Sequence, residues 1–146
     1  MATTLKRCLQ PRSQPAFAST ALLLLRLIVG AAFVLHGWGK IQHPLSWAGP
    51  ESTIPGVFQF LAALSEFGGG IVWILGLLTP LASLGIACTM AVAVHMHMIV
   101  RHDPFVNMTG GMSYEPALSY LGVAILILAL GPGTFSLDAK VFGKRR

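Results

Sequence analysis

Charged residues are scarce in this sequence. Lys, Arg, Asp and Glu make up 10% of the 146 residues and hydrophobic residues make up 54%, and the mean hydropathy is +0.71. A soluble domain carries about a quarter charged residues, because its surface must be hydrated. The deficit excludes a disordered chain, a coiled coil and an ordinary soluble enzyme. It predicts one membrane domain covering residues 1–146, with lipid as the solvent.

Cysteine is nearly absent. Cys8 and Cys88 are far apart, and the Cys-x-x-Cys spacing does not occur. A thiol–disulfide relay needs two neighbouring thiols, so that chemistry is disfavoured. Cys88 is interpreted as a small core residue. The apolar run from Ala21 continues to Trp38, and no convincing small-residue cleavage site for a signal peptidase occurs in it. We therefore expect a retained first span rather than a signal peptide.

The net charge of +5 is concentrated at the two ends of the chain. There is no basic stripe with interleaved aromatic residues, so nucleic acid is not an expected partner. Basic flanks around an apolar region follow the positive-inside rule, which predicts that both termini are cytoplasmic. Anionic lipid headgroups then account for the basic tails, predicted at 1–19 and 131–146. Their basic residues are Lys6, Arg7, Arg12, Lys140, Lys144, Arg145 and Arg146.

Four hydrophobic runs lie between the tails, at about residues 20–38, 57–78, 80–100 and 115–130. Helices of about 20 residues cross the hydrocarbon of a bilayer, which is about 30 Å thick. The predicted fold class is therefore all-α, a membrane four-helix bundle. Because only Thr79 separates the second and third runs, these two helices form a tight hairpin. The two longer loops then lie outside a bacterial inner (plasma) membrane that the chain crosses several times.

The hydrophobic runs contain ionisable residues to which we assign function. A charged side chain at mid-membrane costs roughly 2.5–3.5 kcal/mol, so each needs a partner or a task. Most of them lie in the outer half, where we predict a ligand-binding cluster. Histidine and protonated glutamate suit this role because both donate hydrogen bonds and exchange protons near neutral pH. The predicted ligand-binding residues are His36, Glu66, His95, His97 and Glu115, with Arg26 and Lys40 balancing charge.

Alternatives remain open at these positions. Glu66 could be a proton-exchanging group in a ligand pocket. It could also be structural, as a member of an ion pair with Arg26 or Lys40 or as a protonated acid hydrogen-bonded across helices, and the two roles are compatible. His95 and His97 lie about 200° apart around a helix, so one is expected to face the bundle and the other the interface near water. Either histidine could instead stabilise a helix C-terminus.

The first hydrophobic run carries a stripe at helical spacing that combines polar and small residues. The glycines at 68–70, next to Glu66, would let another backbone approach closely, and they also make a homo-oligomer reasonable. Aromatic side chains near this cluster could stack on the ring of a ligand. The stripe consists of Arg26, Gly30, Phe33, Gly37 and Lys40. The predicted aromatic lining is Phe33, Trp38, Phe67 and Trp73.

A cluster of soft ligands near the end of the third run raises the question of a metal. The segment 95–98 reads His-Met-His-Met. Imidazole and thioether suit copper, and paired intramembrane histidines can ligate haem. The i, i+2 spacing is poor for a helical chelate, however, and Met is common in membrane cores. We therefore predict no metal site, and we rank haem and copper below a quinone as a cofactor.

Taken together, these segments resemble the DoxX family of small four-helix integral membrane proteins. The resemblance covers about residues 20 to 143 and rests on the order and spacing of four pieces. They are LLLLRLIVGAAFVLHGWGK at 22–40, LSEFGGGIVWILGLLTP at 64–80, SYEPALSYL at 113–121 and LGPGTFSLD at 130–138. The two histidines of the third run depart from the family's pattern, which would place one histidine there.

The resemblance implies a quinone-linked or helper subunit of a membrane oxidoreductase assembly, with possible oxidoreductase subunits or soluble redox enzymes as partners. The resemblance implies that the family's functional residues correspond to Arg26, His36, Lys40, Glu66 and Glu115. It implies that residues 131–138 form a structural end-piece. We assign no catalytic residue, because electrons would have to come from another subunit. The competing predictions are a non-catalytic scaffold or assembly factor, and a small proton-coupled transporter.

Overall fold

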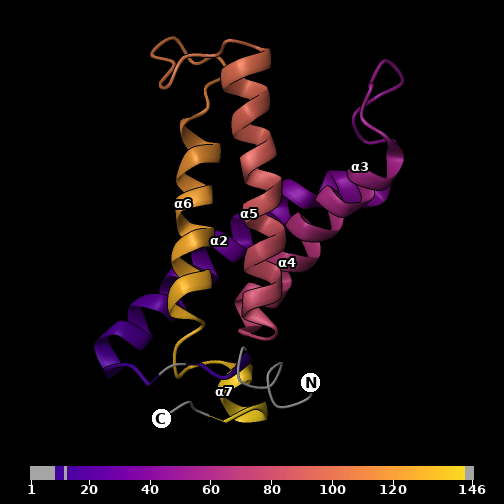
Figure 1. The fold of residues 1–146 in the computed structure, drawn as a ribbon. Coiled ribbons are helices and arrows are strands. Elements are labelled where there is room, and N and C mark those ends of the chain that lie inside the picture. The colour runs from indigo at the N-terminus through magenta and orange to yellow at the C-terminus, as the bar shows by residue number, and fades with distance from the viewer. Residues whose placement is uncertain (1–8, 12, 144–146) are drawn as a thin grey trace.

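The computed structural model describes residues 9–11 and 13–143, and within them the chain is all-α, as predicted, without a β-strand. Five helical segments lie between residues 16 and 141 (Figure 1). They are α2 (Ala16–Gln42); α3 (Gly56–Ala63), η1 (Leu64–Gly68) and α4 (Gly69–Leu75) in succession; α5 (Thr79–His95) continued by η2 (Met96–Val100); α6 (Glu115–Leu130); and α7 (Leu137–Val141). Cys8 and all the basic tail residues except Lys140 lie outside the described residues. Cys88 is exposed, so the prediction of a core residue was wrong: Ile86 and Met90 form the buried face of α5, and a residue two positions from each points away from it.

Three of these segments are long and apolar enough to cross a membrane. They span 16–42 with 27 residues, 56–75 with 20 and 79–100 with 22. The apolar helix α6 has 16 residues, which is about 24 Å at 1.5 Å per residue and short of about 30 Å of hydrocarbon. The described chain therefore has three or four apolar helices of membrane length.

Helix α2 extends about four residues beyond the predicted run at each end. It begins directly after Pro15, whose fixed φ suits the start of a helix. Gly39 does not interrupt it, and the helix ends at Gln42. The next residue, His43, precedes Pro44, and a residue before proline is sterically disfavoured in the helical conformation. His43 is not helical, with φ −131°, so the helix ends before it. The extension keeps Lys40 inside the helix.

The second segment contains a π-helical turn in its middle. This turn, η1, covers 64–68 and includes Glu66. A π-turn inserts an extra residue into the helical repeat, which changes the direction of the side chains that follow. The segment ends where Gly76 adopts a left-handed conformation with φ +64°, a conformation that glycine adopts without a steric penalty. A second π-turn, η2, ends the third segment and includes His97.

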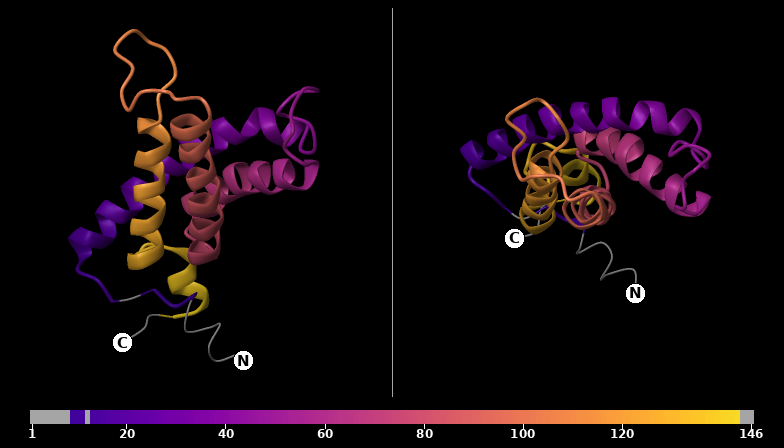
Figure 2. Two further views of the ribbon diagram at one scale, coloured as in Figure 1. Left: turned by 45° about the horizontal axis from the view of Figure 1, so that its top comes forward. Right: turned by 90° about the horizontal axis from the view of Figure 1, so that it is seen from above.

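The helices form two antiparallel pairs, α2 with the second segment and α5 with α6, which Figure 2 shows side by side. Glycine allows the first pair to approach closely: a Cβ on Gly30 would lie 2.9 Å from the Gly70 carbonyl oxygen, and one on Gly37 would lie 2.7 Å from the Phe67 Cα. The core lies where the two pairs meet. It consists of Val29, Phe33, Trp73, Ile86, Met90, Ala124 and Ile127.

The two long loops lie at one end of the molecule and α7 at the other (Figure 1). We call these ends the loop end, with residues 43–55 and 101–114, and the α7 end. At the α7 end, Asp138 is fully buried and caps the start of α5, since its carboxylate accepts hydrogen bonds from the backbone N–H of Leu78 at 2.7 Å and of Thr79 at 3.0 Å. The C-terminal segment thus fastens the α4–α5 turn.

Candidate functional site

An ion pair joins α2 to the second segment near the loop end. Lys40 Nζ lies 2.5 Å from Glu66 Oε1, and the two side chains are 27% and 3% exposed. Of the two partners considered for Glu66, the structure selects Lys40. The close approach at Gly37, one turn before Lys40, brings the helices near enough for this contact.

The other carboxylate oxygen of Glu66 is unusual. Glu66 Oε2 is buried and has no hydrogen-bond partner among the described residues. Burying a charged oxygen without a partner is unfavourable, so such groups in proteins generally have a reason to be there. The π-turn that carries Glu66 is also a local distortion of a kind often found at functional sites.

The loop 43–55 lies against this ion pair. The ring of Trp47 stacks on Lys40, with Nζ 4.6 Å from the ring centroid, a cation–π contact. Trp47 Nε1 donates to the Gln59 carbonyl oxygen at 2.8 Å. The buried Gln59 side chain holds the loop, because it accepts from the Ala48 N–H at 2.9 Å and donates to the Ile54 oxygen at 2.9 Å.

Sequence reasoning did not single out Trp47 or Gln59. The sequence does offer one signal for Gln59, because it is a lone amide side chain within an apolar helix. Amide side chains are rarely buried without hydrogen-bond partners, so this position indicates a buried contact. Nothing in the sequence pairs it with residues 48 and 54, because that contact depends on how the loop folds back.

A group of rings lies deeper along α2. The Phe33 ring packs edge-on against Trp73 with centroids 5.7 Å apart, and it lies 5.1 Å from Tyr120 of α6. His36 also contacts Tyr120, with ring centroids at 6.1 Å, and its side chain is exposed to the outside of the protein. Tyr120, which the sequence analysis did not single out, therefore links α6 to the predicted site residues Phe33 and His36.

The remaining predicted aromatic residues divide between core and surface. Trp73 is fully buried and donates from Nε1 to Ser83 Oγ at 2.9 Å. Trp38 and Phe67 form a separate pair with centroids 5.7 Å apart, and Trp38 is 58% exposed. Trp38 thus faces the surroundings of the helices rather than an enclosed site.

Neither Lys40 nor Glu66 has a hydrogen bond or an ion pair with the predicted residues His95, His97 and Glu115 within the described part of the chain. His97, in η2, contacts Asp103, with Nδ1 2.7 Å from Oδ2. His95 is exposed at the end of α5, and Glu115 is exposed at the start of α6. Within residues 9–11 and 13–143, no group of three or more His, Cys, Asp or Glu side chains could hold a metal ion.

Arg26 belongs to a second buried polar cluster at the α7 end. It has no exposed surface, and its guanidinium donates from Nη2 to the Phe135 oxygen at 2.6 Å and from Nη1 to the Trp73 oxygen at 3.3 Å. It therefore binds the C-terminal segment and α4, and not Glu66. Gly76 leaves the space that the guanidinium occupies.

A groove of about 360 Å³ runs between the second segment and α5. Its lining is apolar or small, and it includes Ser65 and Gly68, which flank Glu66 in the π-turn. The lining residues are Leu64, Ser65, Gly68, Gly69, Val72, Leu78, Leu81, Ala82 and Gly85.

Comparison with known families supports the resemblance seen in the sequence. The family model described as DoxX matches residues 21–101, more than half of the chain. The chain belongs to the DoxX family. The matched stretch runs from α2 to the end of η2 and includes both Lys40 and Glu66. Glu115 and Tyr120 of this DoxX protein lie beyond it.

Two similar proteins extend the comparison past the matched stretch. An uncharacterized protein of Haemophilus influenzae is 31% identical over 125 residues, covering 84% of this chain and 92% of that protein. The inner membrane protein YqjF of Escherichia coli is 29% identical over 123 residues, covering 80% of this chain and 88% of that protein. No solved structure matches. With its apolar helices, this DoxX protein is a multi-pass inner-membrane protein.

Proposed function

We propose that this DoxX protein binds a quinone, or a similar amphipathic molecule of the bilayer, beside the Lys40–Glu66 pair, as a subunit of a membrane oxidoreductase assembly. The observation that carries the proposal is the free carboxylate oxygen of Glu66, which is buried while its sister oxygen is paired with Lys40. A ligand hydroxyl would supply the missing hydrogen bond.

The chemistry of a quinone fits the groups around Glu66. The carbonyl oxygens of a quinone need hydrogen-bond donors, and its reduced form offers two hydroxyl groups. An ionised Glu66 accepts a hydrogen bond from a hydroxyl, and a protonated Glu66 donates one to a carbonyl. Lys40 adds a positive charge and further N–H donors beside the ligand's oxygen atoms.

The ring group offers a second contact for the same ligand. His36 and Tyr120 lie edge to face on α2 and α6, one turn of α2 away from Lys40. His36 is exposed, so a molecule dissolved in lipid reaches it without crossing the core. A histidine on the surface of a span donates a hydrogen bond and exchanges protons near neutral pH. The apolar tail of the ligand would stay in the lipid, and the electrons would come from a partner subunit.

The test compares Glu66→Gln with the unchanged protein. Each is purified gently from membranes and analysed by native mass spectrometry, with extraction of bound lipids and an absorption spectrum from 250 to 600 nm. Because a hydrogen bond to a charged group contributes about 1.5–3 kcal/mol, we expect Glu66→Gln to retain about tenfold less quinone per chain. Glu51→Gln is the matched control, since Glu51 is exposed in the loop 43–55 and carries no predicted ligand contact; this change should leave the quinone content unchanged.

Other results would reject the proposal. Equal quinone content in Glu66→Gln and the unchanged protein would show that Glu66 does not bind the quinone. A collapse in the yield of folded protein would make the Lys40–Glu66 pair structural. A protein without quinone that co-purifies with a soluble enzyme would favour the scaffold, and a Soret band would favour haem.

We also propose that the chain crosses the membrane four times, as a bundle with both termini and α7 in the cytoplasm. The basic tails support this orientation through the positive-inside rule, and the loops 43–55 and 101–114 both lie at the end opposite α7. Green fluorescent protein fused after Arg146 should fluoresce, and alkaline phosphatase inserted at Glu51, which is exposed in its loop, should be active. The reverse pattern would invert the topology.

A further inference from the structure

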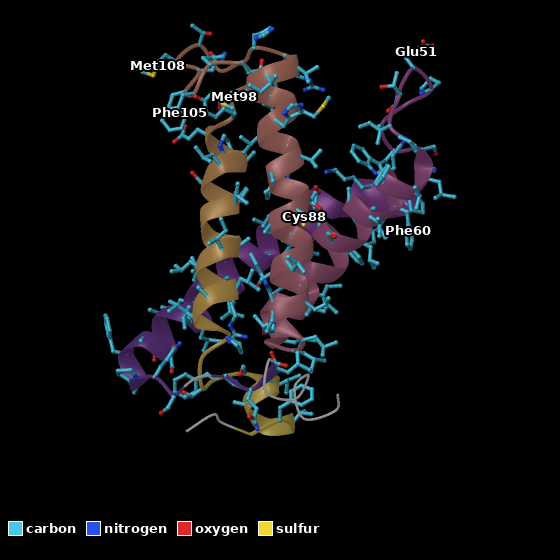
Figure 3. All side chains as sticks on the ribbon, in the orientation of Figure 1. Glu51, Phe60, Cys88, Met98, Phe105 and Met108 are labelled. Atoms are coloured by element: carbon cyan, nitrogen blue, oxygen red, sulfur yellow. The ribbon has the colours of Figure 1, made fainter. Side chains whose placement is uncertain are left out.

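The loop between η2 and α6 presents apolar side chains outward. Residues 104–114 contain no Asp, Glu, Lys, Arg or His. Four large hydrophobic side chains among them are exposed: Phe105 by 51%, Val106 by 42%, Met108 by 90% and Met112 by 57%. Figure 3 shows Phe105 and Met108 at the loop end, on the side away from α5. Such a patch is unfavourable in water, so something is expected to cover it.

The lengths of the neighbouring helices place this loop at the level of the bilayer. The continuous helix of α5 and η2 has 22 residues, about 33 Å, whereas its antiparallel partner α6 spans about 24 Å. The first turn of α6 therefore lies deeper in the membrane than the end of η2. The backbone N–H of Glu115 donates to the Phe105 oxygen at 3.1 Å, and that of Tyr114 donates to the Pro104 oxygen at 3.3 Å. These bonds hold Phe105 beside the start of α6.

The helix ends on either side of the loop also expose apolar side chains. Ile99 and Val100 on η2 are 50% and 55% exposed, and Leu118 on the first turn of α6 is 41% exposed. The loop connects these two helix ends in the chain, and apolar side chains are exposed on both of them as well as on the loop. A membrane-spanning helix that ends in exposed apolar residues has lipid beside them.

Polar groups limit how deeply the loop enters the membrane. Arg101 and His102 are exposed where η2 ends, and such side chains reach toward lipid headgroups. The loop backbone is irregular, and irregular backbone facing lipid is not stable within hydrocarbon. Its depth is therefore the boundary between headgroups and acyl chains, where amphipathic segments bury their apolar side chains.

We propose that the loop 101–114 is an interfacial membrane anchor that inserts Phe105, Val106, Met108 and Met112 into the leaflet at the loop end. The occupant of the patch is the lipid of the bilayer. The other long loop, 43–55, does not share this role, because Trp47 and Gln59 fold it against the Lys40–Glu66 pair. The anchor is independent of the quinone proposal, since it uses none of the residues assigned to that ligand.

The experiment measures the depth of a nitroxide spin label in vesicles of phosphatidylethanolamine and phosphatidylglycerol. In a protein with Cys8→Ser and Cys88→Ala, a single cysteine is introduced as Met108→Cys and, for the matched control in the other loop, as Glu51→Cys. Both positions are labelled in Figure 3, and both side chains are exposed. Electron paramagnetic resonance then compares relaxation by oxygen, which enters lipid, with relaxation by a water-soluble nickel chelate.

We expect the ratio of oxygen to nickel accessibility to be several-fold higher at 108 than at 51, and a second label at Val106→Cys to behave as 108 does. Equal ratios at 108 and 51 would overturn the proposal by placing the loop in water. Protection of the label at 108 from both reagents would also overturn it, because a protein would then cover the patch. If dilution of the protein in lipid removed that protection, the covering protein would be a second copy of this chain.

Discussion

At the scale of single residues, small side chains decide which polar groups meet. Gly30 and Gly37 lie on the buried face of α2, and the stripe predicted from Arg26 to Lys40 faces its neighbours as expected. Lys40 is held at Glu66 because Gly37 allows the backbone at Phe67 to come close. The distance between α2 and the second segment is therefore set by glycines, which have no functional side chain.

Gly37→Ala tests this packing. The added Cβ would fall 2.7 Å from the Phe67 Cα and 2.8 Å from its Cβ, and overpacking of this kind costs about 1–3 kcal/mol. We expect a lower melting temperature in detergent and a weakened Lys40–Glu66 pair. Gly39→Ala is the control, since nothing lies within 4 Å of a Cβ there. It should stabilise the helix by about 0.5–1 kcal/mol. Equal effects at 37 and 39 would refute the close-contact explanation.

At the scale of elements, the loops of this protein have different roles. The loop 43–55 is held over the Lys40–Glu66 pair by Trp47 and by the amide of Gln59. The loop 101–114 is held mainly at its two ends, by the pairing of His97 with Asp103 and by the packing of Phe105 on Tyr114, with ring centroids 5.3 Å apart. One loop covers a polar pair and the other presents an apolar surface.

Gln59→Leu should release the loop 43–55. It removes both side-chain hydrogen bonds of Gln59 and leaves the Ala48 N–H and the Ile54 carbonyl without these partners, a loss of about 1–3 kcal/mol. Limited proteolysis in detergent should then cut this loop several-fold faster. Gln42→Leu is the matched control, since Gln42 is exposed and bonds only within its own helix. Unchanged proteolysis in Gln59→Leu would show that Gln59 does not hold the loop.

At the scale of the whole molecule, the C-terminal segment completes the α7 end. Arg26 is fully buried, and one of its two carbonyl partners, Phe135, lies in that segment. Asp138 caps α5 from the same segment, and its own N–H donates to the Gly76 oxygen at 2.8 Å. The two helix pairs are therefore joined at this end by residues that follow the last apolar helix.

A truncation after Leu130 should destabilise the whole bundle. It removes the Phe135 oxygen, one of the two carbonyl partners of the Arg26 guanidinium, and a hydrogen bond to a charged group contributes about 1.5–3 kcal/mol. It also removes the Asp138 cap, which contributes about 0.5–2 kcal/mol. The amount of monodisperse protein recovered by size-exclusion chromatography should fall several-fold. Normal recovery after this truncation would show that the segment is dispensable.

The sequence by itself determined the class of this protein and most of its helices. Scarce charge and long apolar runs leave lipid as the only solvent that such a chain can face, and periodicity placed Arg26, Gly30, Phe33, Gly37 and Lys40 on one face of α2, because a helix has a constant angular repeat. The segments that resemble DoxX proteins were also visible without coordinates, and the family match over residues 21–101 confirmed those at 22–40 and 64–80.

Only the tertiary structure decided which of these residues meet. Arg26 and Lys40 share one stripe and lie 14 positions apart, so spacing along α2 does not tell which of them pairs with Glu66. The choice depends on the axial register of α2 against the second segment, which is set by contacts between Gly30 and Gly70 and between Gly37 and Phe67. The roles of Tyr120, Gln59 and Asp138 depend in the same way on distant parts of the chain. The axial register depends on contacts between the surfaces of two helices, so the sequence of either helix alone does not determine it.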